Sequence, residues 1–557
     1  MDTGMAQRGL PLGHQPAHPL QLTGWVALGA SLLVTVLAFA GLIGFSHSGP
    51  DWHLLQDPYF HQILRFSLWQ ALLSSLLAVL PAWPIARALY YLPELPARNA
   101  FLGLCLLYFV MPTLILITGL VALLGHAGLL SPLLSLLTGK PWNLYGLAGI
   151  LLGHLLLNLP FAVRMIYLQL QAIPASSWQL AHQLKLSPGQ RLRHIEWPML
   201  RGRLSMLLGL VFILCFNSFA IVLALGGGPR STTLEVAIYQ ALKYDFNLPE
   251  ALTLAWTQLL IAGGLFLLVA RFGNSAWLSL DTASPPRIPR PRRGTRRLMQ
   301  TLYFGTWVVL LLPLLALVPA ILREGLPNLQ YLALVQPTLL TLGLGSGAAL
   351  GATGLAYLIL QPLRAASRSR QPRRQLLLEW LATHQLVTPA MVLSVGLFVL
   401  LLPYHDLQRW GLVWVVLLNT LLILPFAVQQ LKPRLLQFDQ QYDPLMRNLK
   451  LRSLQRWRAE WPFLQPVVAA SFALVLVLAM GDVAIFAIFG NPAQPTLPWL
   501  IYGYASSYRI AEASLASLLL LIICGLSLWG IGRLQRTAPQ TDNRGASTSL
   551  PGASPYA

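Results

Sequence analysis

The sequence has few charged residues. They make up 10% of its 557 residues, whereas hydrophobic residues make up 55%; soluble domains contain roughly 25% charged and 45–50% apolar residues. This composition excludes an ordinary soluble protein and indicates a polytopic membrane protein surrounded by lipid. The formal net charge of +20 does not indicate nucleic-acid binding, because the basic residues lie in short loops between apolar runs, where membrane orientation places them.

Paired cysteines and nucleotide-binding motifs are also missing. The three cysteines, Cys105, Cys215 and Cys524, lie inside apolar runs without paired spacing, which argues against a disulfide framework or a metal site. A P-loop needs Gly, four residues and then Gly-Lys-Ser or Gly-Lys-Thr, whereas the one Gly-Lys pair is Gly139-Lys140, followed by proline. We therefore expect no metal, no cofactor and no enzymatic hydrolysis of ATP by this chain.

The sequence does contain many apolar runs long enough to cross a membrane. A span needs about 20 residues, at 1.5 Å each, to cross about 30 Å of hydrocarbon. The runs predict twelve transmembrane helices, near residues 23–45, 66–90, 100–124, 144–168, 203–225, 252–271, 302–322, 337–361, 378–403, 411–431, 466–489 and 513–532. The predicted fold is an all-α polytopic membrane protein.

A change of composition divides these spans into two groups of six. The segment PPRIPRPRRGTRR, within residues 273–300, is too rich in proline and arginine to continue a helix and is interpreted as a cytoplasmic linker. The predicted organisation is a cytoplasmic tail, a first six-helix domain, the linker, a second six-helix domain and a disordered tail, at residues 1–22, 23–272, 273–300, 301–534 and 535–557.

The distribution of basic residues predicts the orientation. If the N-terminus is cytoplasmic, most Lys and Arg residues fall in cytoplasmic segments. The seven exceptions, in or beside the outer segments, are Arg65, Lys140, Arg230, Lys243, Arg323, Arg409 and Arg509. We therefore expect both termini in the cytoplasm.

Short motifs recur in the two groups of spans. Leu-Pro-Phe-Ala-Val occurs at 159–163 and 424–428, and Leu-Lys-Leu occurs at 184–186 and 449–451, with the same offset in both cases. Glu-Trp-Pro ends at Pro198 and again at Pro462, an offset that is shorter by a single position. These offsets indicate a duplicated six-span unit. An even number of spans gives both copies the same orientation, so the repeats are parallel and related by an axis along the membrane normal.

Two of these motifs lie in one basic, amphipathic cytoplasmic loop of each half. A short helix of this kind is unstable alone in water, so each loop needs a surface on which to bury its apolar side chains. The membrane interface is one such surface, but the repetition of identical side chains favours a protein partner. The apolar residues at helical spacing are Trp178, Ala181 and Leu184 in the first loop and Tyr442, Leu445 and Leu449 in the second.

These loops resemble the permease signature loop of bacterial ATP-binding-cassette (ABC) importers, which reads Glu-Ala-Ala, three residues, Gly and, further on, Leu-Pro. Lys185 and Lys450 stand at the glycine position, which removes the residue that most easily takes a left-handed turn. In that family the loop is the coupling helix, which sits in a groove of the ATPase. The resemblance implies that the docking residues are Trp178, Leu180, Ala181, Leu184, Lys185, Pro198, Leu445, Met446, Leu449, Lys450 and Pro462.

Longer stretches resemble the fused two-half permease of the bacterial importer of thiamine and thiamine pyrophosphate. They include FSLWQALLSSLLAVLPAWPIARALY at 66–90, LALGGGPRSTTLEVAIYQALKYDF at 223–246 and GDVAIFAIFG at 481–490. The resemblance implies a type I ABC importer permease fold in the bacterial inner membrane. It also implies two copies of a separate ATPase, a periplasmic substrate-binding protein and thiamine or a related small solute as cargo. A related permease for ferric iron or another small solute stays an alternative, because composition and spacing do not indicate thiamine.

Asp482 is the exceptional carboxylate within an apolar run. A charge at the centre of a membrane helix costs about 2.5–3.5 kcal/mol to insert and normally faces protein or water. Asp482, with Asn217 and Ser218 at the matching position of the first half, is either a polar patch on the translocation path or part of a structural hydrogen bond. A twelve-span secondary transporter, the alternative of another class, predicts more ionisable residues within its spans.

Overall fold

The computed structural model describes residues 19–44, 51–270, 291–324, 331–386, 388–403, 407–451 and 453–537. Every regular element in those residues is a helix, as the apolar runs predict. Most of the predicted tails and of the predicted linker lies outside the described residues.

The helices of the first half are α1 (Pro19–Gly44), α2 (Pro58–Tyr91), α3 (Arg98–Val110), α4 (Thr113–Leu124), α5 (Ser131–Thr138), α6 (Leu147–Gln171), α7 (Ala175–Gln183), α8 (Pro188–Arg191), α9 (Trp197–Phe216), α10 (Ala220–Leu225), α11 (Leu234–Lys243) and α12 (Leu248–Ala270). Those of the second half are α13 (Arg293–Glu324), α14 (Val335–Arg368), α15 (Pro372–Ala382), α16 (Ala390–Leu401), α17 (Leu407–Asn448), α18 (Ser453–Met480), α19 (Ala484–Phe489), α20 (Leu497–Ser506) and α21 (Ile510–Thr537).

The two halves repeat one order of helices, and several matched helices have equal lengths. Helices α2 and α14 have 34 residues each, α4 and α16 have 12, and α11 and α20 have 10. Helices α10 and α19 both have 6 residues. The duplication indicated by short motifs therefore extends through the fold.

Nine of the described helices are long and apolar enough to cross a membrane. Helices α3 and α4 form a tenth candidate span that is bent by 104° at Met111 and Pro112, because proline cannot donate the backbone hydrogen bond that a continuous helix needs. Helices α12 and α16 lie where the other two spans are predicted, and α16 alone, with 12 residues, is too short to cross the hydrocarbon. The number twelve stays a prediction.

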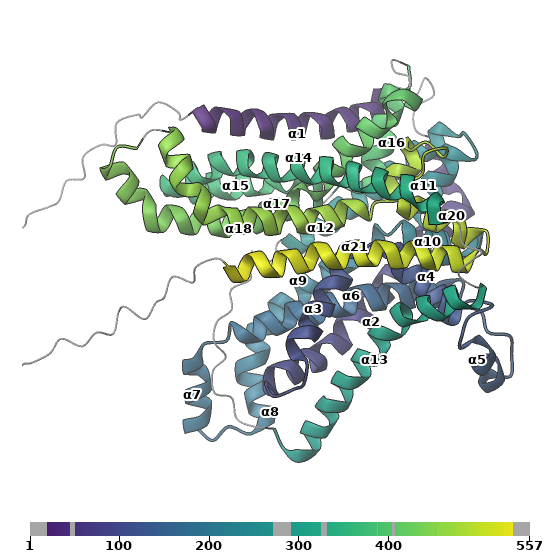
Figure 1. The fold of residues 1–557 in the computed structure, drawn as a ribbon, viewed down its shortest axis with the longest axis horizontal. Helices are drawn as coiled ribbons and strands as arrows, with labels where there is room; N and C mark the ends of the chain where they lie inside the picture. Colours follow the sequence, from purple (N-terminus) through teal and green to yellow (C-terminus); the bar gives the residue numbers. More distant parts are fainter. Residues whose placement is uncertain are drawn as a thin grey trace, which may run out of the picture.

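The first helix of each half packs on the other half. Helix α1 lies against α14 and α16, whereas α13 lies against α2 and α4 (Figure 1). A Cβ atom on Gly396 of α16 would lie 2.1 Å from the carbonyl oxygen of Ala38, and one on Gly119 of α4 would lie 2.3 Å from that of Pro313. Gly119 and Gly396 occupy matching positions in α4 and α16. The close packing of α13 on α4 and of α1 on α16 therefore requires a glycine in both cases.

Candidate functional site

The two predicted docking loops lie at the same end of the molecule. Figure 1 shows α7 and α8 at the end where α17 and α18 are joined, whereas α5 lies at the opposite end. The first loop continues through α7 and α8 into α9, and the second is the short connection between α17 and α18. One partner surface can therefore face both loops.

Each loop closes with a left-handed lysine. In the first loop the N–H of Leu186 donates to the carbonyl of Ala181 at 3.0 Å, and the N–H of Lys185 donates to that of His182 at 3.1 Å. This pair of bonds is the Schellman motif, which ends a helix with a left-handed residue. The φ angles are +49° at Lys185 and +48° at Lys450. The backbone therefore makes the turn that glycine favours, although lysine replaces the glycine of the signature loop.

Four leucines at matching positions are exposed on the two loops. The exposed fractions are 55% for Leu180 and 61% for Leu184 in the first loop, and 55% for Leu445 and 60% for Leu449 in the second. The members of each pair are four residues apart, which places them on one side of a helix. The two loops thus present the same pair of apolar side chains to the same degree.

Three of the predicted docking residues are turned into the protein instead. Trp178 is 2% exposed, and its ring lies 6.1 Å from each of the rings of Tyr90 and Tyr91. Ala181 and Met446, which occupy matching positions, are also buried. Of the stripe predicted for the first loop, only Leu184 is on the free surface. Lys185 and Lys450 are exposed beside the leucines.

The two prolines of Glu-Trp-Pro are exposed and lie within longer helical segments. The first lies within a continuous helix over residues 188–216 and the second within α18, which begins at Ser453. In the first half a π-helical turn, Leu192–Glu196, precedes Pro198. A turn of this kind changes the backbone hydrogen-bond spacing and lets a proline lie inside a helix.

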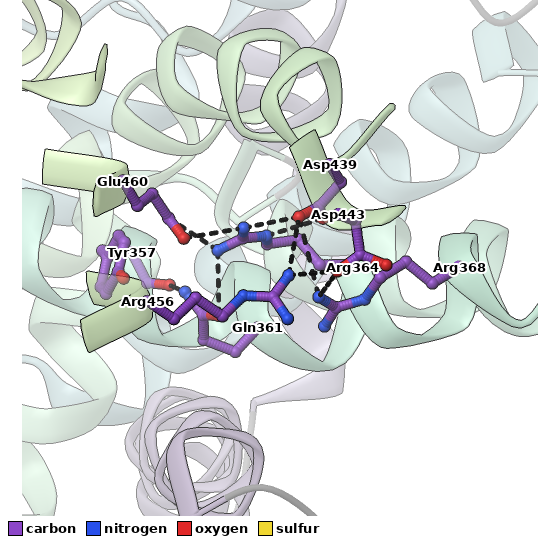
Figure 2. Close-up of polar contacts among 8 residues, drawn as sticks. All are labelled: Tyr357, Gln361, Arg364, Arg368, Asp439, Asp443, Arg456 and Glu460. Carbon is purple, nitrogen blue, oxygen red and sulfur yellow. Dashed lines mark hydrogen bonds and ion pairs between the residues drawn. The ribbon is translucent and has the colours of Figure 1, made fainter. Parts of the chain in front are cut away.

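A buried ionic cluster lies beneath the second loop. The guanidinium of Arg364 donates to both carboxylate oxygens of Asp439, at 2.7 and 2.9 Å, and to both of Glu460, at 2.8 and 3.0 Å. Asp443 pairs with Arg368 at 3.4 Å. The cluster joins α14, α17 and α18 just inside the turn at Lys450. Figure 2 shows its residues: Tyr357, Gln361, Arg364, Arg368, Asp439, Asp443, Arg456 and Glu460.

A smaller ionic group lies beneath the first loop. Arg87 donates to the Glu196 carboxylate through Nε at 2.8 Å and through Nη2 at 3.2 Å. The Tyr91 hydroxyl donates to the same carboxylate at 2.6 Å. Glu196 is fully buried. Sequence reasoning noted the repeated Glu-Trp-Pro motif but assigned no role to its glutamate, because the arginine partner is 109 residues away in the chain.

The predicted polar patch is divided between the two halves. The Asp482 carboxylate caps α19, because it accepts the N–H groups of Ile485 at 3.3 Å and Phe486 at 3.2 Å. Asn217 accepts a hydrogen bond from Gln258 at 3.3 Å. Each side chain is therefore bonded within its own half, and Asp482 serves a local structural role. Ser218 is half-buried.

Asp482 nevertheless lies where the halves meet. A Cβ atom on the neighbouring Gly481 would lie 3.1 Å from the Cα atom of Pro112. The break between α18 and α19 thus contacts the break between α3 and α4. Breaks in membrane helices leave backbone groups that lie against protein or water rather than lipid, and these two breaks lie against each other at the interface between the halves.

Comparisons with known proteins identify relatives of the chain. Residues 75–274 match the family described as binding-protein-dependent transport system inner membrane component. The chain is 35% identical to the thiamine transport system permease protein of Escherichia coli over 95% of this chain and 99% of that protein. It is 36% identical to the protein of the same name from Brucella abortus (84% and 86% covered) and 33% identical to that from Haemophilus influenzae (84% and 88%).

Proposed function

This chain belongs to the family of thiamine transport system permeases, and from that premise we propose that it forms the membrane path of an ATP-driven importer of thiamine and its phosphates. It is a multi-pass inner-membrane protein and a transport subunit, not an enzyme. In the proposal, a periplasmic binding protein delivers the solute at the outer face. Two copies of an ATPase bind the cytoplasmic loops, and both termini are cytoplasmic.

The observation that carries the proposal is the matched exposure of Leu180, Leu184, Leu445 and Leu449. Each loop keeps two large apolar side chains in water, which is unfavourable unless a partner covers them. Because the loops lie at one end of the molecule (Figure 1), two ATPase subunits side by side can cover both. ATP-driven closure of the ATPases then moves the loops together and opens the path alternately to each side.

The double substitution Leu184→Glu with Leu449→Glu tests this docking. We expect co-purification with the ATPase to weaken at least about tenfold, because burying an unpaired polar group costs about 1–3 kcal/mol and 1.4 kcal/mol is a factor of ten. Membrane insertion is unchanged. The matched control is Leu137→Glu in α5, at the opposite end, where the leucine is 72% exposed. Unchanged association of the double variant contradicts the docking role.

Uptake by proteoliposomes that contain the purified complex tests the transport role. We expect labelled thiamine to accumulate only with ATP and the binding protein present. Recovery of an active permease without an ATPase, with uptake driven by an ion gradient, contradicts the proposal in favour of a secondary transporter. ATP-driven uptake of ferric iron but not thiamine contradicts only the choice of solute.

A further inference from the structure

The buried arginine–glutamate pair is present in both halves at matching positions. Arg87 in α2 and Arg364 in α14 occupy the same position, counted from the first residue of each helix. Glu196 and Glu460 are the glutamates of the two Glu-Trp-Pro motifs. Each pair joins the inner end of the second helix of its half to the helix that follows the docking loop. The two halves therefore make the same connection at the same place.

A second repeated contact lies near the other end of the same helices. The backbone N–H of Leu234, the first residue of α11, donates to the hydroxyl of Ser67 in α2 at 3.0 Å. The N–H of Leu497, the first residue of α20, donates to the hydroxyl of Thr341 in α14 at 2.7 Å. These N–H groups belong to the first turn of a helix and have no partner within it. The hydroxyls thus attach α11 and α20 to α2 and α14.

Helices α2 and α14 therefore connect the docking loops to the outer part of the protein. Ser67 and Arg87 lie in opposite halves of α2, and Thr341 and Arg364 lie in opposite halves of α14. At a rise of about 1.5 Å per residue, the two separations along the helix axes are about 30 and 35 Å. The second helix of each half thus spans most of a bilayer between one contact and the other.

The far ends of these connections lie where the halves meet. Helix α11 packs against α16 and α19, and α20 packs against α4. The Lys243 ammonium, at the end of α11, donates to the carbonyl of Ile488 in α19 at 2.7 Å. A displacement of α11 or α20 therefore changes contacts between the halves on the outer side.

We propose that the Arg87–Glu196 and Arg364–Glu460 pairs transmit movement of the docked loops through α2 and α14 to α11 and α20. The inference rests on the proposed function, since it presupposes that an ATPase moves the loops. A buried ion pair holds its two helices firmly, because separating the charges leaves each of them desolvated and unpaired. When a loop moves, the start of the following helix carries its glutamate, and the arginine makes α2 or α14 follow. Arg87, Glu196, Arg364 and Glu460 are positioning residues that do not contact the solute.

The test is the variant Glu196→Gln with Glu460→Gln in the complete complex with ATPase and binding protein. Glutamine keeps the size of the side chain but removes the charge that holds the arginine. We expect the ATPase to co-purify as with the unaltered chain. We also expect thiamine transported per ATP hydrolysed to fall about tenfold, within the usual range of allosteric coupling. A merely structural role would lower the melting temperature and leave this ratio unchanged.

Two results overturn the inference. One is an unchanged transport-to-hydrolysis ratio in E196Q/E460Q, and the other is loss of ATPase association, which would show that the pairs shape the docking surface instead. If that variant does not accumulate in the membrane, the charge exchange Arg87→Glu with Glu196→Arg replaces it. The exchange should restore coupling relative to R87E alone, and failure to do so also overturns the inference. An unaltered complex that shows no ATP-driven uptake contradicts the proposed function itself.

Glu379→Gln is the matched control. Glu379 pairs with Lys432 within the second half, but its side chain is 29% exposed and the pair joins α15 to α17, not the helix after the loop. We expect E379Q to leave the transport-to-hydrolysis ratio unchanged.

The outer contacts of α2 and α14 provide an independent check. Ser67→Ala with Thr341→Val should lower the ratio in the same direction as E196Q/E460Q, because it detaches α11 and α20 from the same helices.

Discussion

The two docking loops have the same exposed surface but different support beneath it. In the first loop Trp178 packs between Tyr90 and Tyr91. In the second loop the positions of Trp178 and Tyr91 are occupied by Asp443 and Arg368, which form an ion pair. Aromatic packing in one half thus replaces ionic contacts in the other. Because the supporting residues changed while the exposed leucines did not, the requirement common to both loops lies on the surface, which supports the proposed docking of a partner there.

A single residue explains why the loops also differ in backbone. Pro174 precedes α7 and separates it from α6, because a proline disfavours the helical conformation of the residue before it and lacks an N–H donor. Asp439 occupies the matching position, and α17 continues through it to Asn448. The second loop gains a carboxylate for Arg364 at the same position. Aspartate in place of proline at this position therefore accounts both for the continuous helix and for one carboxylate of the ionic cluster in the second half.

The largest expected effect is a loss of stability, which should be greater for the ionic cluster beneath the second loop than for the smaller ionic group beneath the first. Arg364→Met leaves the buried Glu460 without its arginine and leaves Asp439 with only longer contacts, to Arg368 at 3.7 Å and to Arg456 at 3.5 Å, so we expect a loss of about 3–5 kcal/mol of stability. Arg87→Met leaves one carboxylate, which keeps its bond from Tyr91, and the Arg87 side chain is 23% exposed against 2% for Arg364. The loss of stability in Arg87→Met should therefore be smaller. Thermal unfolding of the purified protein in detergent measures both, with Lys432→Met as the control, and equal losses contradict the comparison.

Exchange of the supporting residues tests whether the two solutions are interchangeable. Trp178→Asp alone places an unpaired charge beneath the first loop, and Tyr91→Arg alone removes the hydroxyl that donates to Glu196, so each should destabilise it. Together the two substitutions recreate the pair that Asp443 and Arg368 form. We expect the double variant to be more stable than the sum of the single effects by about 1 kcal/mol, as for residues in contact. Strict additivity in thermal unfolding would show that the two supports are not equivalent.

The smallest expected effect concerns the left-handed lysine turn, in which the two loops agree most closely. Lys185 and Lys450 carry the steric strain of a left-handed conformation, which glycine avoids. Lys185→Gly and Lys450→Gly should each raise stability by roughly 0.5–1 kcal/mol, because the cost of the left-handed conformation exceeds the extra entropy that glycine loses on folding. Because the φ angles of the two lysines are nearly identical, the two effects should be equal. Alanine at each position controls for loss of the lysine side chain, and a response in only one loop contradicts the equivalence of the turns.

The fold was largely predictable from the sequence, because apolar runs and repeated motifs are local signals. The predicted span at 144–168 corresponds to α6, for example, and the repeat offsets correspond to matched helices. The orientation of the loop residues was not predictable. Trp178 fits the helical stripe as well as Leu184 does, and only the tyrosines of α2 decide that it is buried.

Two further features depend on residues far apart in the chain. The partner of Glu196 is an arginine in another helix, and no local pattern identifies which of the many basic residues it is. The packing of α1 and α13 on the opposite halves could not be predicted either, since a hydropathy profile shows that a span exists but not which helices it contacts. The left-handed turns at Lys185 and Lys450 were also unexpected, because backbone hydrogen bonds rather than the residue type fix them.

The exchange of α1 and α13 also has a consequence for biogenesis. The ribosome completes α1 long before its neighbours α14 and α16, because the whole of the first half and α13 are synthesised in between. During that interval α1 lacks the helices on which it finally packs, and neither half reaches its final packing until the last helices are inserted. Once assembled, the halves are interlocked, so a protease cut between α12 and α13 would not separate them.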